Sequence, residues 1–277
     1  MNANSKTDIL LEMLKEDSAE YKTLETDMYD LTEKKNAIRS LMNIRMSVKT
    51  SEELLQVQDE YLQEELVAKG VVALSEIPTI KAQYDSRVPF ADKLSLWQGD
   101  ITRLQVGAIV NAANSQMLGC FVPCHRCIDN AIHSAAGMQL REECYHIMQN
   151  KRMKYGRQYE EATGTATLTK AYNLPCDYVI HTVGPIVYGK LNDALRQDLR
   201  NCYESTLKCC VENGIRSVAF CCISTGEFHF PNEEAAEIAV QAVTDFLQTG
   251  AQMDRVIFNV FKQGDYDIYK TILGITE

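Results

Sequence analysis

The hydrophobic positions divide the chain into two regions with different periodicities. Residues 1–70 contain almost no Gly or Pro, and apolar side chains recur at helical spacing in residues 9–14 and again in residues 54–62. This pattern predicts two or three amphipathic helices. A connector through Pro78 and Pro89 follows, because proline is typical of turns and loops.

From about residue 93 onward, short β-rich runs alternate with amphipathic runs. Residues 217–223 are continuously apolar, as expected of a strand that is buried on both faces. The alternation predicts a mostly parallel sheet with helices on both faces, and ligands of such sheets bind at the carboxyl ends of the strands. The predicted strands are residues 94–98, 107–111, 164–169, 178–182, 217–223 and 255–261, and the predicted helices are residues 128–149, 195–213, 232–248 (capped by Asn232) and 265–273.

Length and composition limit the classes of protein that fit. The chain has 277 residues, of which 45% are hydrophobic and 24% are charged, so it can form one large core or one domain with a helical extension. No run approaches the roughly 18 apolar residues that a membrane-spanning helix needs. The first twenty residues lack the basic start and apolar stretch of a signal peptide. We therefore expect a cytoplasmic protein that does not bind membranes.

The net charge argues against nucleic acid as a partner. The formal charge is −10 and the sequence pI is about 5.1, whereas a duplex binder needs a basic surface to displace counterions from phosphates. A small anionic ligand remains compatible with this charge, because backbone amides and helix N-termini can hold phosphates.

Four of the metal-binding side chains are concentrated in one short segment. The chain has ten cysteines, and without a signal peptide these are expected to stay reduced. Cys120, Cys124, His125 and Cys127 form a compact cluster. All four together would make a closed structural zinc site, whereas three ligands would leave one position open for catalysis. Cys124 and His125 are adjacent and fit one tetrahedral ion awkwardly, and thiolates with imidazole favour zinc.

Two motifs follow the first two strong strands of the second region. The first is the run Gly-Asp-Ile-Thr, which contains Asp100 and Ile101. The second is Asn-Ala-Ala-Asn, in which Asn111 and Asn114 could fix sugar hydroxyls through paired donors and acceptors. Either motif alone is also compatible with an ordinary turn.

Two further motifs open helices. An Asp-x-x-Ile-His-x-Ala-Ala-Gly run begins at Asp129, directly after the cysteine cluster. The other is the run Ile-Ser-Thr-Gly-Glu-Phe-His-Phe-Pro at residues 223–231, between a buried strand and a helix. Its glycine, hydroxyl side chains and free amides suit a pyrophosphate, and Phe228 could lie against a ribose.

Together, in this order and spacing, the four motifs resemble the macrodomain family over residues 90–277. The resemblance implies a three-layer α/β/α macrodomain with a central, mostly parallel mixed sheet, and residues 1–80 would be a helical extension that packs on it. It also implies an ADP-ribose site, in which Asp100 contacts the adenine amine beside the backbone of Ile101. Asn114 would contact the distal ribose. The other implied ligand-binding residues are Asn111, Ser224, Thr225, Gly226, Glu227 and Phe228.

Many hydrolytic macrodomains have a glycine-rich stretch where this chain has the cysteine cluster. In this respect the chain resembles a zinc-containing microbial subclass of macrodomains. The ligands of that subclass follow a Cys-x4-His-x-Cys pattern, which corresponds to Cys120, His125 and Cys127, with Cys124 as an extra cysteine. The resemblance implies a Zn2+-dependent mono-ADP-ribosyl hydrolase acting on modified acidic side chains, an ADP-ribosylglutamate or ADP-ribosylaspartate hydrolase. It further implies a lipoyl carrier protein as the ADP-ribosylated partner and a functional link to a sirtuin-like ADP-ribosyltransferase, with ADP-ribose as the product.

Within this hypothesis Asn114 and Asp129 are the candidate catalytic residues. Asn114 would position the distal ribose, and Asp129 would act as general base or orient a water. The alternative for Asp129 is an aspartate that satisfies backbone amides at a helix start. The alternative for the whole chain is a module that binds ADP-ribose without hydrolysing it, with zinc holding the loop. The three histidines His133, His181 and His229 are expected to be packed or exposed residues rather than ligands.

The amino-terminal helices also allow two interpretations. They extend the core of the main domain, or they form part of a surface that docks the protein substrate.

Overall fold

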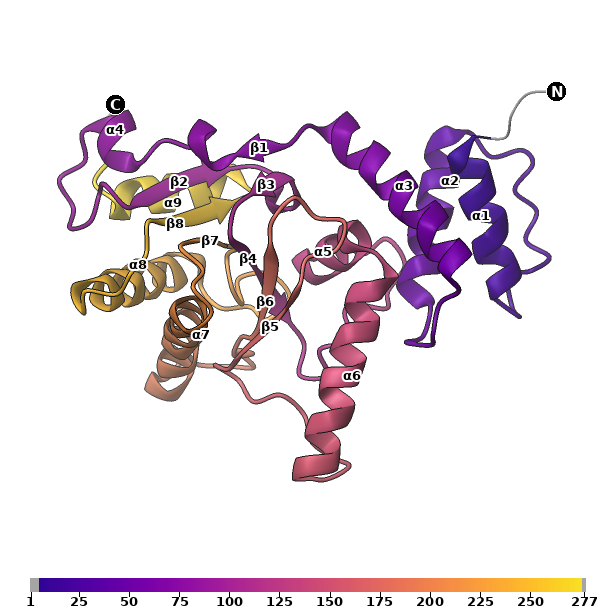
Figure 1. Cartoon of the computed structure of the whole chain (residues 1–277). Coiled ribbons are helices and arrows are strands. Elements are labelled where there is room, and N and C mark those ends of the chain that lie inside the picture. Colours follow the sequence, from indigo (N-terminus) through magenta and orange to yellow (C-terminus); the bar gives the residue numbers. More distant parts are fainter. Residues whose placement is uncertain (1–4, 276–277) are drawn as a thin grey trace. The chain divides into compact units, whose positions relative to one another are not determined.

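The structure is a computed structural model that describes residues 5–275. The chain folds into two compact units (Figure 1). We call them the helical unit, which comprises residues up to 70, 117–159 and 172–174, and the sheet unit, which comprises residues 71–116, 160–171 and those from 175 on. The amino-terminal helices thus share a unit with the cysteine-rich segment. The predicted boundary between residues 80 and 90 stays a prediction.

Three of the helices in the helical unit come from the first 70 residues, as the periodicity predicted. Each begins at a polar cap: the side chains of Ser5, Asp30 and Ser51 accept hydrogen bonds from backbone amides of the first turn. Their apolar faces share one core, which includes Leu10, Ile38 and residues of the third helix. The helices of this unit are α1 (Lys6–Asp17), α2 (Leu31–Ile44), α3 (Glu52–Lys69), α5 (Ile128–Ala136) and α6 (Met138–Tyr155).

The prediction of one continuous helix over residues 128–149 was wrong, because the chain breaks at Gly137. Gly137 has φ of 97°, a conformation that glycine adopts without steric penalty, and it separates α5 from α6. The buried side chain of Gln58 then accepts a hydrogen bond from the amide of Met138 at 2.8 Å. A residue 80 positions away thereby satisfies the start of α6, and local periodicity contains no sign of it.

A six-stranded sheet forms the centre of the sheet unit. The strand order is β2-β8-β7-β4-β6-β5, in which the first five strands are parallel and β5 runs antiparallel to β6 at one edge. The strands are β2 (Leu94–Gln98), β4 (Ala108–Ala113), β5 (Ala166–Lys170), β6 (Tyr178–Val183), β7 (Ser217–Phe220) and β8 (Arg255–Val260). Two shorter strands, β1 (Val72–Ala73) and β3 (Leu104–Gln105), pair in parallel. This agrees with the predicted mostly parallel mixed sheet.

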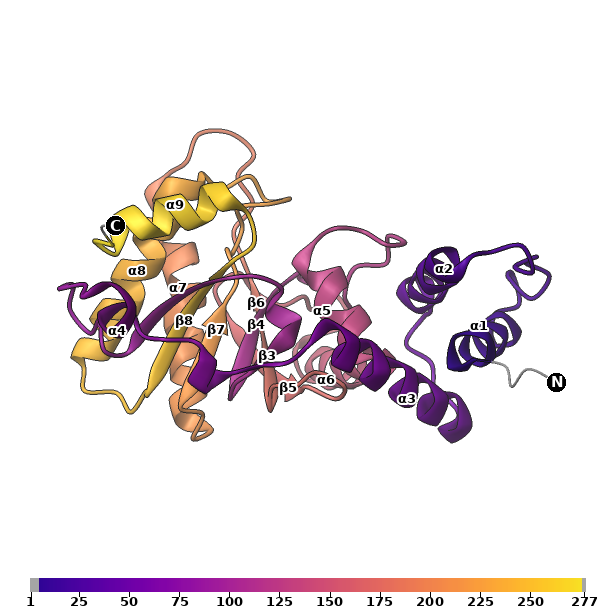
Figure 2. The same cartoon turned by 90° about the horizontal axis from the view of Figure 1, so that it is seen from above.

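Four α-helices belong to the described part of the sheet unit: α4 (Ile80–Tyr84), α7 (Asp193–Glu212), α8 (Asn232–Gln248) and α9 (Gln263–Ile272). Helix α7 packs on β5 and β6, α9 packs on β2 and β8, and α8 packs on both of these helices (Figures 1 and 2). Short 3-10 turns span Leu74–Glu76 and Ile101–Arg103. These helices leave the carboxyl ends of the parallel strands to the loops.

Two details around β7 differ from the predictions. The strand ends at Phe220 rather than at residue 223, so residues 221–231 form a longer loop than expected. Pro231, and not Asn232, is the N-cap of α8. The Asn232 side chain instead donates a hydrogen bond to Asp265 Oδ1 at 2.6 Å, which links α8 to α9.

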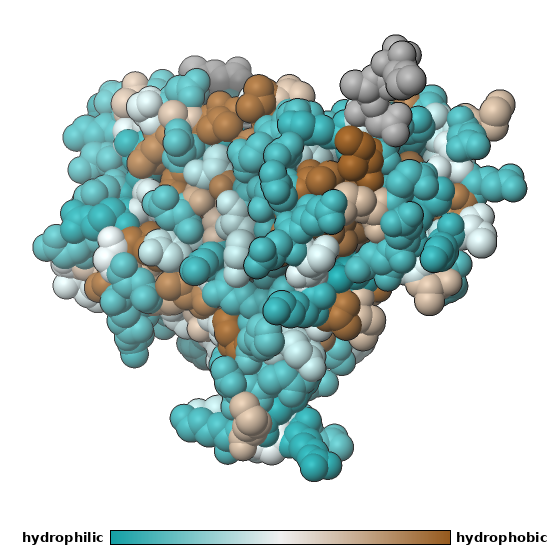
Figure 3. Space-filling model, turned by 45° about the vertical axis from the view of Figure 1, so that its right-hand side comes forward, coloured by the Kyte–Doolittle hydropathy of each residue, from teal (hydrophilic) through white to brown (hydrophobic). Residues whose placement is uncertain are grey.

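Hydrophilic side chains dominate the face of the molecule drawn in Figure 3, and hydrophobic side chains form small scattered patches there. Among residues 5–275, no helix combines the length and the apolar character needed to cross a bilayer.

Candidate functional site

The predicted ligand residues of the sheet unit gather at one edge of the sheet. Asp100 follows β2, Asn114 follows β4, and the loop with Ser224 follows β7. Because these strands are parallel, their carboxyl ends lie on the same side of the sheet. We call this set of strand ends and loops the ligand edge. It also includes Gly184 after β6 and Phe261 after β8.

At the β2 end, Asp100 fixes the turn that follows the strand. Its Oδ1 atom accepts hydrogen bonds from the backbone amide of Thr102 at 3.0 Å and from the Thr102 hydroxyl at 2.7 Å. The Ile101 side chain is only 1% exposed, so it belongs to the core. The backbone is therefore the part of Ile101 that remains for a ligand, and its contact with adenine stays a prediction.

The two asparagines of the second motif have different environments. Asn111 is fully buried within β4, and its Nδ2 atom lies 3.1 Å from His181 Nδ1. Burial lowers the pKa of His181 to about 3, so this imidazole is neutral. Asn114 lies one residue past β4, is partly exposed, and accepts a hydrogen bond from the amide of Gln116. Exposure favours Asn114 for contact with a ribose, and a ligand contact by Asn111 stays a prediction.

The loop after β7 contains a serine that has a strained backbone conformation and a buried hydroxyl. Ser224 has φ of 65°, and its residue is 5% exposed. Its Oγ atom has no hydrogen-bond partner among residues 5–275, whereas buried polar atoms are nearly always paired. The Ser224 carbonyl accepts from the amide of Phe230 at 3.0 Å, which closes the loop. The rest of the predicted segment, residues 225–228, is partly or fully exposed.

Gly184, which the sequence analysis missed, allows this loop to approach β6. A Cβ atom at this position would lie 2.1 Å from Ser224 Oγ and 2.9 Å from the Ile223 side chain. The amide of Val187 also donates to the carbonyl of Phe228 at 2.9 Å, so the loops after β6 and β7 are joined. The available signal in the sequence was a glycine two residues after the predicted strand at residues 178–182.

Phe261 is a second residue that the sequence analysis missed. Its side chain is 74% exposed, although it directly follows a buried strand. The amide of Gly99 donates to the carbonyl of Val260 at 2.9 Å, so Phe261 lies on the strand end adjacent to the one that carries Asp100. An exposed aromatic ring at this edge is suited to stacking on a flat ligand group. The sequence analysis placed Phe261 inside the strand at residues 255–261, so it gave no reason to expect an exposed ring.

In the helical unit, three of the cysteine-cluster side chains come together. The ligand atoms of Cys120, His125 and Cys127 all lie within 4.8 Å of one another, and Cys120 Sγ is 3.6 Å from His125 Nδ1. Sulfur and nitrogen ligands of a tetrahedral zinc ion are about 3.6 Å apart, given bond lengths near 2.3 and 2.0–2.1 Å. The donor set and its spacing therefore fit zinc. We call these three residues the metal cluster.

Cys127 has two roles in the local structure. It is the N-cap of α5, where its Sγ atom accepts a hydrogen bond from the amide of Asn130 at 3.4 Å. Burial, with Cys120 and Asp129 nearby, raises the pKa of the Cys127 thiol to about 12. Without a cation this thiol is neutral, and metal binding to such a thiol releases its proton.

Cys124 lies outside the metal cluster. Its Sγ atom is 3.2 Å from Ser40 Oγ and donates to the carbonyl of Asn36 at 3.4 Å, so the thiol interacts with α2. The backbone of Cys124 has a positive φ of 51°. Of the two arrangements that the sequence allowed, the structure brings together the set of three donors.

Asp129 is buried in the first turn of α5. It is 5% exposed, and its Oδ1 atom lies 3.5 Å from Nε2 of the similarly buried His133. The backbone amide of Asn130 is capped by the Cys127 thiol, so the start of α5 has a cap other than the carboxylate. A catalytic role for Asp129 stays a prediction, and His133 is packed, as expected.

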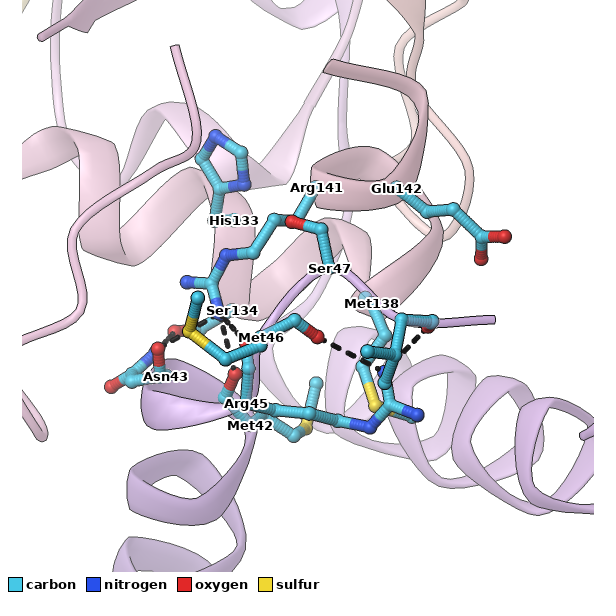
Figure 4. Close-up of a pocket in the computed structure, with 12 residues that line it drawn as sticks. Met42, Asn43, Arg45, Met46, Ser47, His133, Ser134, Met138, Arg141 and Glu142 are labelled. Carbon is cyan, nitrogen blue, oxygen red and sulfur yellow. Dashed lines mark hydrogen bonds between the residues drawn. The ribbon is translucent and has the colours of Figure 1, made fainter. Parts of the chain in front are cut away.

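Two hollows lie outside the predicted ADP-ribose site. One in the helical unit, beside His133 and Arg141 (Figure 4), has a volume of about 10 Å³, enough for about one water molecule. The other is an open groove of about 860 Å³ in the sheet unit, lined by charged residues such as Arg196, Arg200 and Glu237. None of the residues predicted to bind ADP-ribose lines either hollow.

Comparison with known proteins places the chain in a family. The Macro domain model matches residues 110–239. A protein-ADP-ribose hydrolase of Treponema medium is 46% identical over 245 residues, which are 88% of this chain and 89% of that protein. The chain belongs to the macrodomain family. A protein-ADP-ribose hydrolase of Staphylococcus aureus (strain MSSA476) is 44% identical over 233 residues, covering 84% of this macrodomain and 82% of that protein.

A solved structure gives the same result for the fold. The macrodomain of Trypanosoma brucei, in complex with ADP-ribose, matches with a TM-score of 0.63 and 29% identity, covering 85% of this chain and 95% of that chain. The predicted α/β macrodomain fold with a central mixed sheet is thereby confirmed.

Proposed function

We propose that this macrodomain is a zinc-dependent protein mono-ADP-ribosyl hydrolase that removes ADP-ribose from modified acidic side chains. The relatives at 44–46% identity, which it matches over most of their length, are named protein-ADP-ribose hydrolases. The observation that carries the zinc-dependent form of the proposal is the metal cluster. Three donors leave one coordination position for water or substrate, which is the arrangement of catalytic rather than structural zinc sites.

The ligand edge would bind the ADP-ribosyl group. Asp100 would accept from the adenine amine, and the exposed ring of Phe261 would stack on the adenine. The loop from Ser224 to Phe228 would hold the diphosphate through its backbone amides, and the unpaired Ser224 hydroxyl would donate to a phosphate oxygen. Asn114 would orient the distal ribose.

Hydrolysis adds water across the bond between the ribose anomeric carbon and the carboxyl oxygen of the side chain. The water oxygen bonds to the anomeric carbon, its proton is removed, and the carboxylate leaves with the electron pair of the broken bond. Asp129 would accept the proton or orient the water, and Asn114 would keep the ribose in position. Cys120, His125 and Cys127 would hold the metal, whose chemistry when bound is that of a Lewis acid.

The proposed protein substrate is an ADP-ribosylated lipoyl carrier protein, and the proposed source of the modification is a sirtuin-like ADP-ribosyltransferase. The support for both is the resemblance of the cysteine pattern and of the amino-terminal extension to the zinc-containing microbial subclass. The same resemblance supports an acidic-residue linkage, whose cleavage would release a carboxylate.

The test compares wild type with Cys127→Ala on an ADP-ribosylated carrier protein. Zinc content and the affinity for free ADP-ribose are measured in the same preparations. We expect the variant to lose zinc and at least about 100-fold in turnover, while it still binds ADP-ribose. If wild type binds ADP-ribose but releases none from any ADP-ribosylated protein offered, the chain is a reader of the modification, and the hydrolase proposal is wrong.

A further inference from the structure

The loop that carries the metal cluster has no regular structure of its own. Residues 114–127 contain neither helix nor strand, and a backbone hydrogen bond from His125 to the carbonyl of Val122 gives one turn. A site built on such a segment depends on groups outside the loop to fix the directions of its ligands. In the helical unit those groups come from three helices, α2, α5 and α6.

Arg39 of α2 contacts the loop at a metal-cluster residue. Its Nη2 atom donates to the carbonyl of His125 at 3.1 Å and to Asn130 Oδ1 at 2.6 Å, and its Nε atom donates to the same oxygen at 3.1 Å. The planar guanidinium is suited to this arrangement, because several donors in one fork hold two acceptors at fixed angles.

Asn130 connects Arg39 to the rest of the loop. It is fully buried, and its Nδ2 atom donates to the carbonyl of Val122 at 3.0 Å. Its backbone amide donates to Cys127 Sγ at 3.4 Å. Arg39 thus connects to two members of the metal cluster, directly to His125 and through Asn130 to Cys127.

Arg141 of α6 holds the third member. This guanidinium is 5% exposed and lies 4.3 Å from the centre of the Phe121 ring. It donates to the carbonyl of Leu118 at 2.7 Å and to that of Cys120 at 3.4 Å. The same group donates to the carbonyls that end α2, at residues 42, 43 and 45, as Figure 4 shows for the α2 side.

A second pair of α2 side chains contacts the middle of the loop. Asn43, which is 1% exposed, accepts from the amide of Cys124 at 3.0 Å, and Ser40 Oγ lies 3.2 Å from Cys124 Sγ. Arg39, Ser40 and Asn43 are spaced at i, i+1 and i+4, so they occupy one face of the helix. Apolar residues of α2, including Ile38 and Leu41, belong to the core with α1 and α3. The helix therefore has one face for the core and another for the loop.

We propose that the polar face of α2, together with Arg141, positions the ligands of the metal cluster, so that the amino-terminal helices determine metal affinity. Arg39 and Arg141 are positioning residues in this scheme, since each acts through the backbone or the side chain of a loop residue. The inference rests on the proposed zinc site. It gives the amino-terminal helices a role other than docking the protein substrate.

The experiment measures zinc affinity of the full-length protein by competition with a chelator. Arg39→Ala is compared with Arg39→Lys and with Arg45→Ala. Arg45 is a matched control, because its guanidinium binds Asp17 and the carbonyls of Met46 and Val48, outside the cysteine-rich loop. We expect Arg39→Ala to weaken zinc binding about 10-fold or more, Arg39→Lys to restore part of it, and Arg45→Ala to match wild type.

A spectroscopic readout separates positioning from general destabilisation. The same proteins are loaded with Co2+, whose absorption bands report ligand geometry, and Arg39→Ala is expected to shift these bands while affinity for ADP-ribose stays at the wild-type value. Arg141→Lys is expected to act in the same direction. If Arg39→Ala binds zinc as tightly as wild type and its cobalt spectrum is unchanged, the positioning role is wrong although the metal site stands. A wild-type chain that binds no zinc would overturn the metal site itself.

Discussion

The ligand edge and the metal cluster are built on opposite principles. At the ligand edge, strand ends place Asp100, Asn114 and the Ser224 loop, and the sheet's own hydrogen bonds fix their spacing. The metal cluster lies on a segment without helix or strand. Contacts from α2, 81–86 positions away in sequence, hold it together with contacts from Asn130 and Arg141. The geometry of the first therefore follows from the sheet, whereas the geometry of the second depends on a few polar side chains.

This contrast predicts that affinity for ADP-ribose and zinc content respond to different substitutions. Changes at the ligand edge lower the affinity for ADP-ribose and leave zinc content unchanged, and changes around the metal cluster do the reverse.

The largest effect is expected from Asp129→Asn, which keeps the size of the side chain and removes its ability to accept a proton. If Asp129 is the general base, kcat for release of ADP-ribose falls by about 100-fold or more, since general base catalysis typically contributes 10²–10⁴-fold. Zinc content and ADP-ribose affinity should both stay at wild-type values. Loss of thermal stability with unchanged kcat would instead assign Asp129 to the structure of α5, beside His133.

Gly184→Ala is expected to disturb the ligand edge by sterics alone. The new methyl group would lie 2.1 Å from Ser224 Oγ, so the phosphate-binding loop must shift. Overpacking of this kind costs roughly 1–3 kcal/mol, which corresponds to about 5- to 150-fold in affinity if the cost falls on the bound state. Isothermal titration with ADP-ribose measures the change. Gly189→Ala is the matched control, because a Cβ atom there contacts nothing within 4 Å; equal effects of both would remove Gly184 from the site.

Phe261→Ala is expected to weaken ADP-ribose binding by about 10-fold, because stacking on a base contributes roughly 1–3 kcal/mol. The side chain is 74% exposed, so its removal should leave the melting temperature and the zinc content unchanged. Phe261→Trp should retain the affinity. Binding of AMP and of ribose 5-phosphate would locate the loss: only AMP should respond if the ring stacks on adenine.

The same contrast explains which parts were predictable from the sequence. Asp100 and Asn114 each follow a predicted strand, and the local pattern placed both at strand ends. For Ser224 the pattern gave the loop but not the strand end, because β7 already ends at Phe220. The spacing of Cys120, His125 and Cys127 likewise predicted three side chains that the structure brings together. Local pattern fails where a distant residue decides: Cys124 interacts with Ser40, 84 positions away, and Gln58 satisfies the start of α6. Phe261 was missed because its exposure depends on where β8 ends, not on its residue type.

The smallest effect, on thermal stability, is expected from the ion pair that joins α2 to α1. Lys34 of α2 contacts Asp8 of α1 at 2.7 Å, and together with the Ser5 hydroxyl it holds the pKa of Asp8 below its ordinary value of 3.8. Because the folded-state pKa is depressed, this carboxylate adds stability above about pH 4, and the contribution is lost as the pH falls through the lower folded-state value. Asp8→Asn should therefore lower the melting temperature at pH 7 by an amount worth at most about 1 kcal/mol, and the difference should shrink as the pH falls through the folded-state pKa of Asp8.

Asp27→Asn, an exposed aspartate between the same helices, serves as the control. A difference that does not shrink on acidification would mean that Asp8 acts through its capping hydrogen bonds with Ser5 rather than through its charge. In either case zinc affinity should not change, because Arg39 and Asn43, rather than the ion pair with α1, contact the loop.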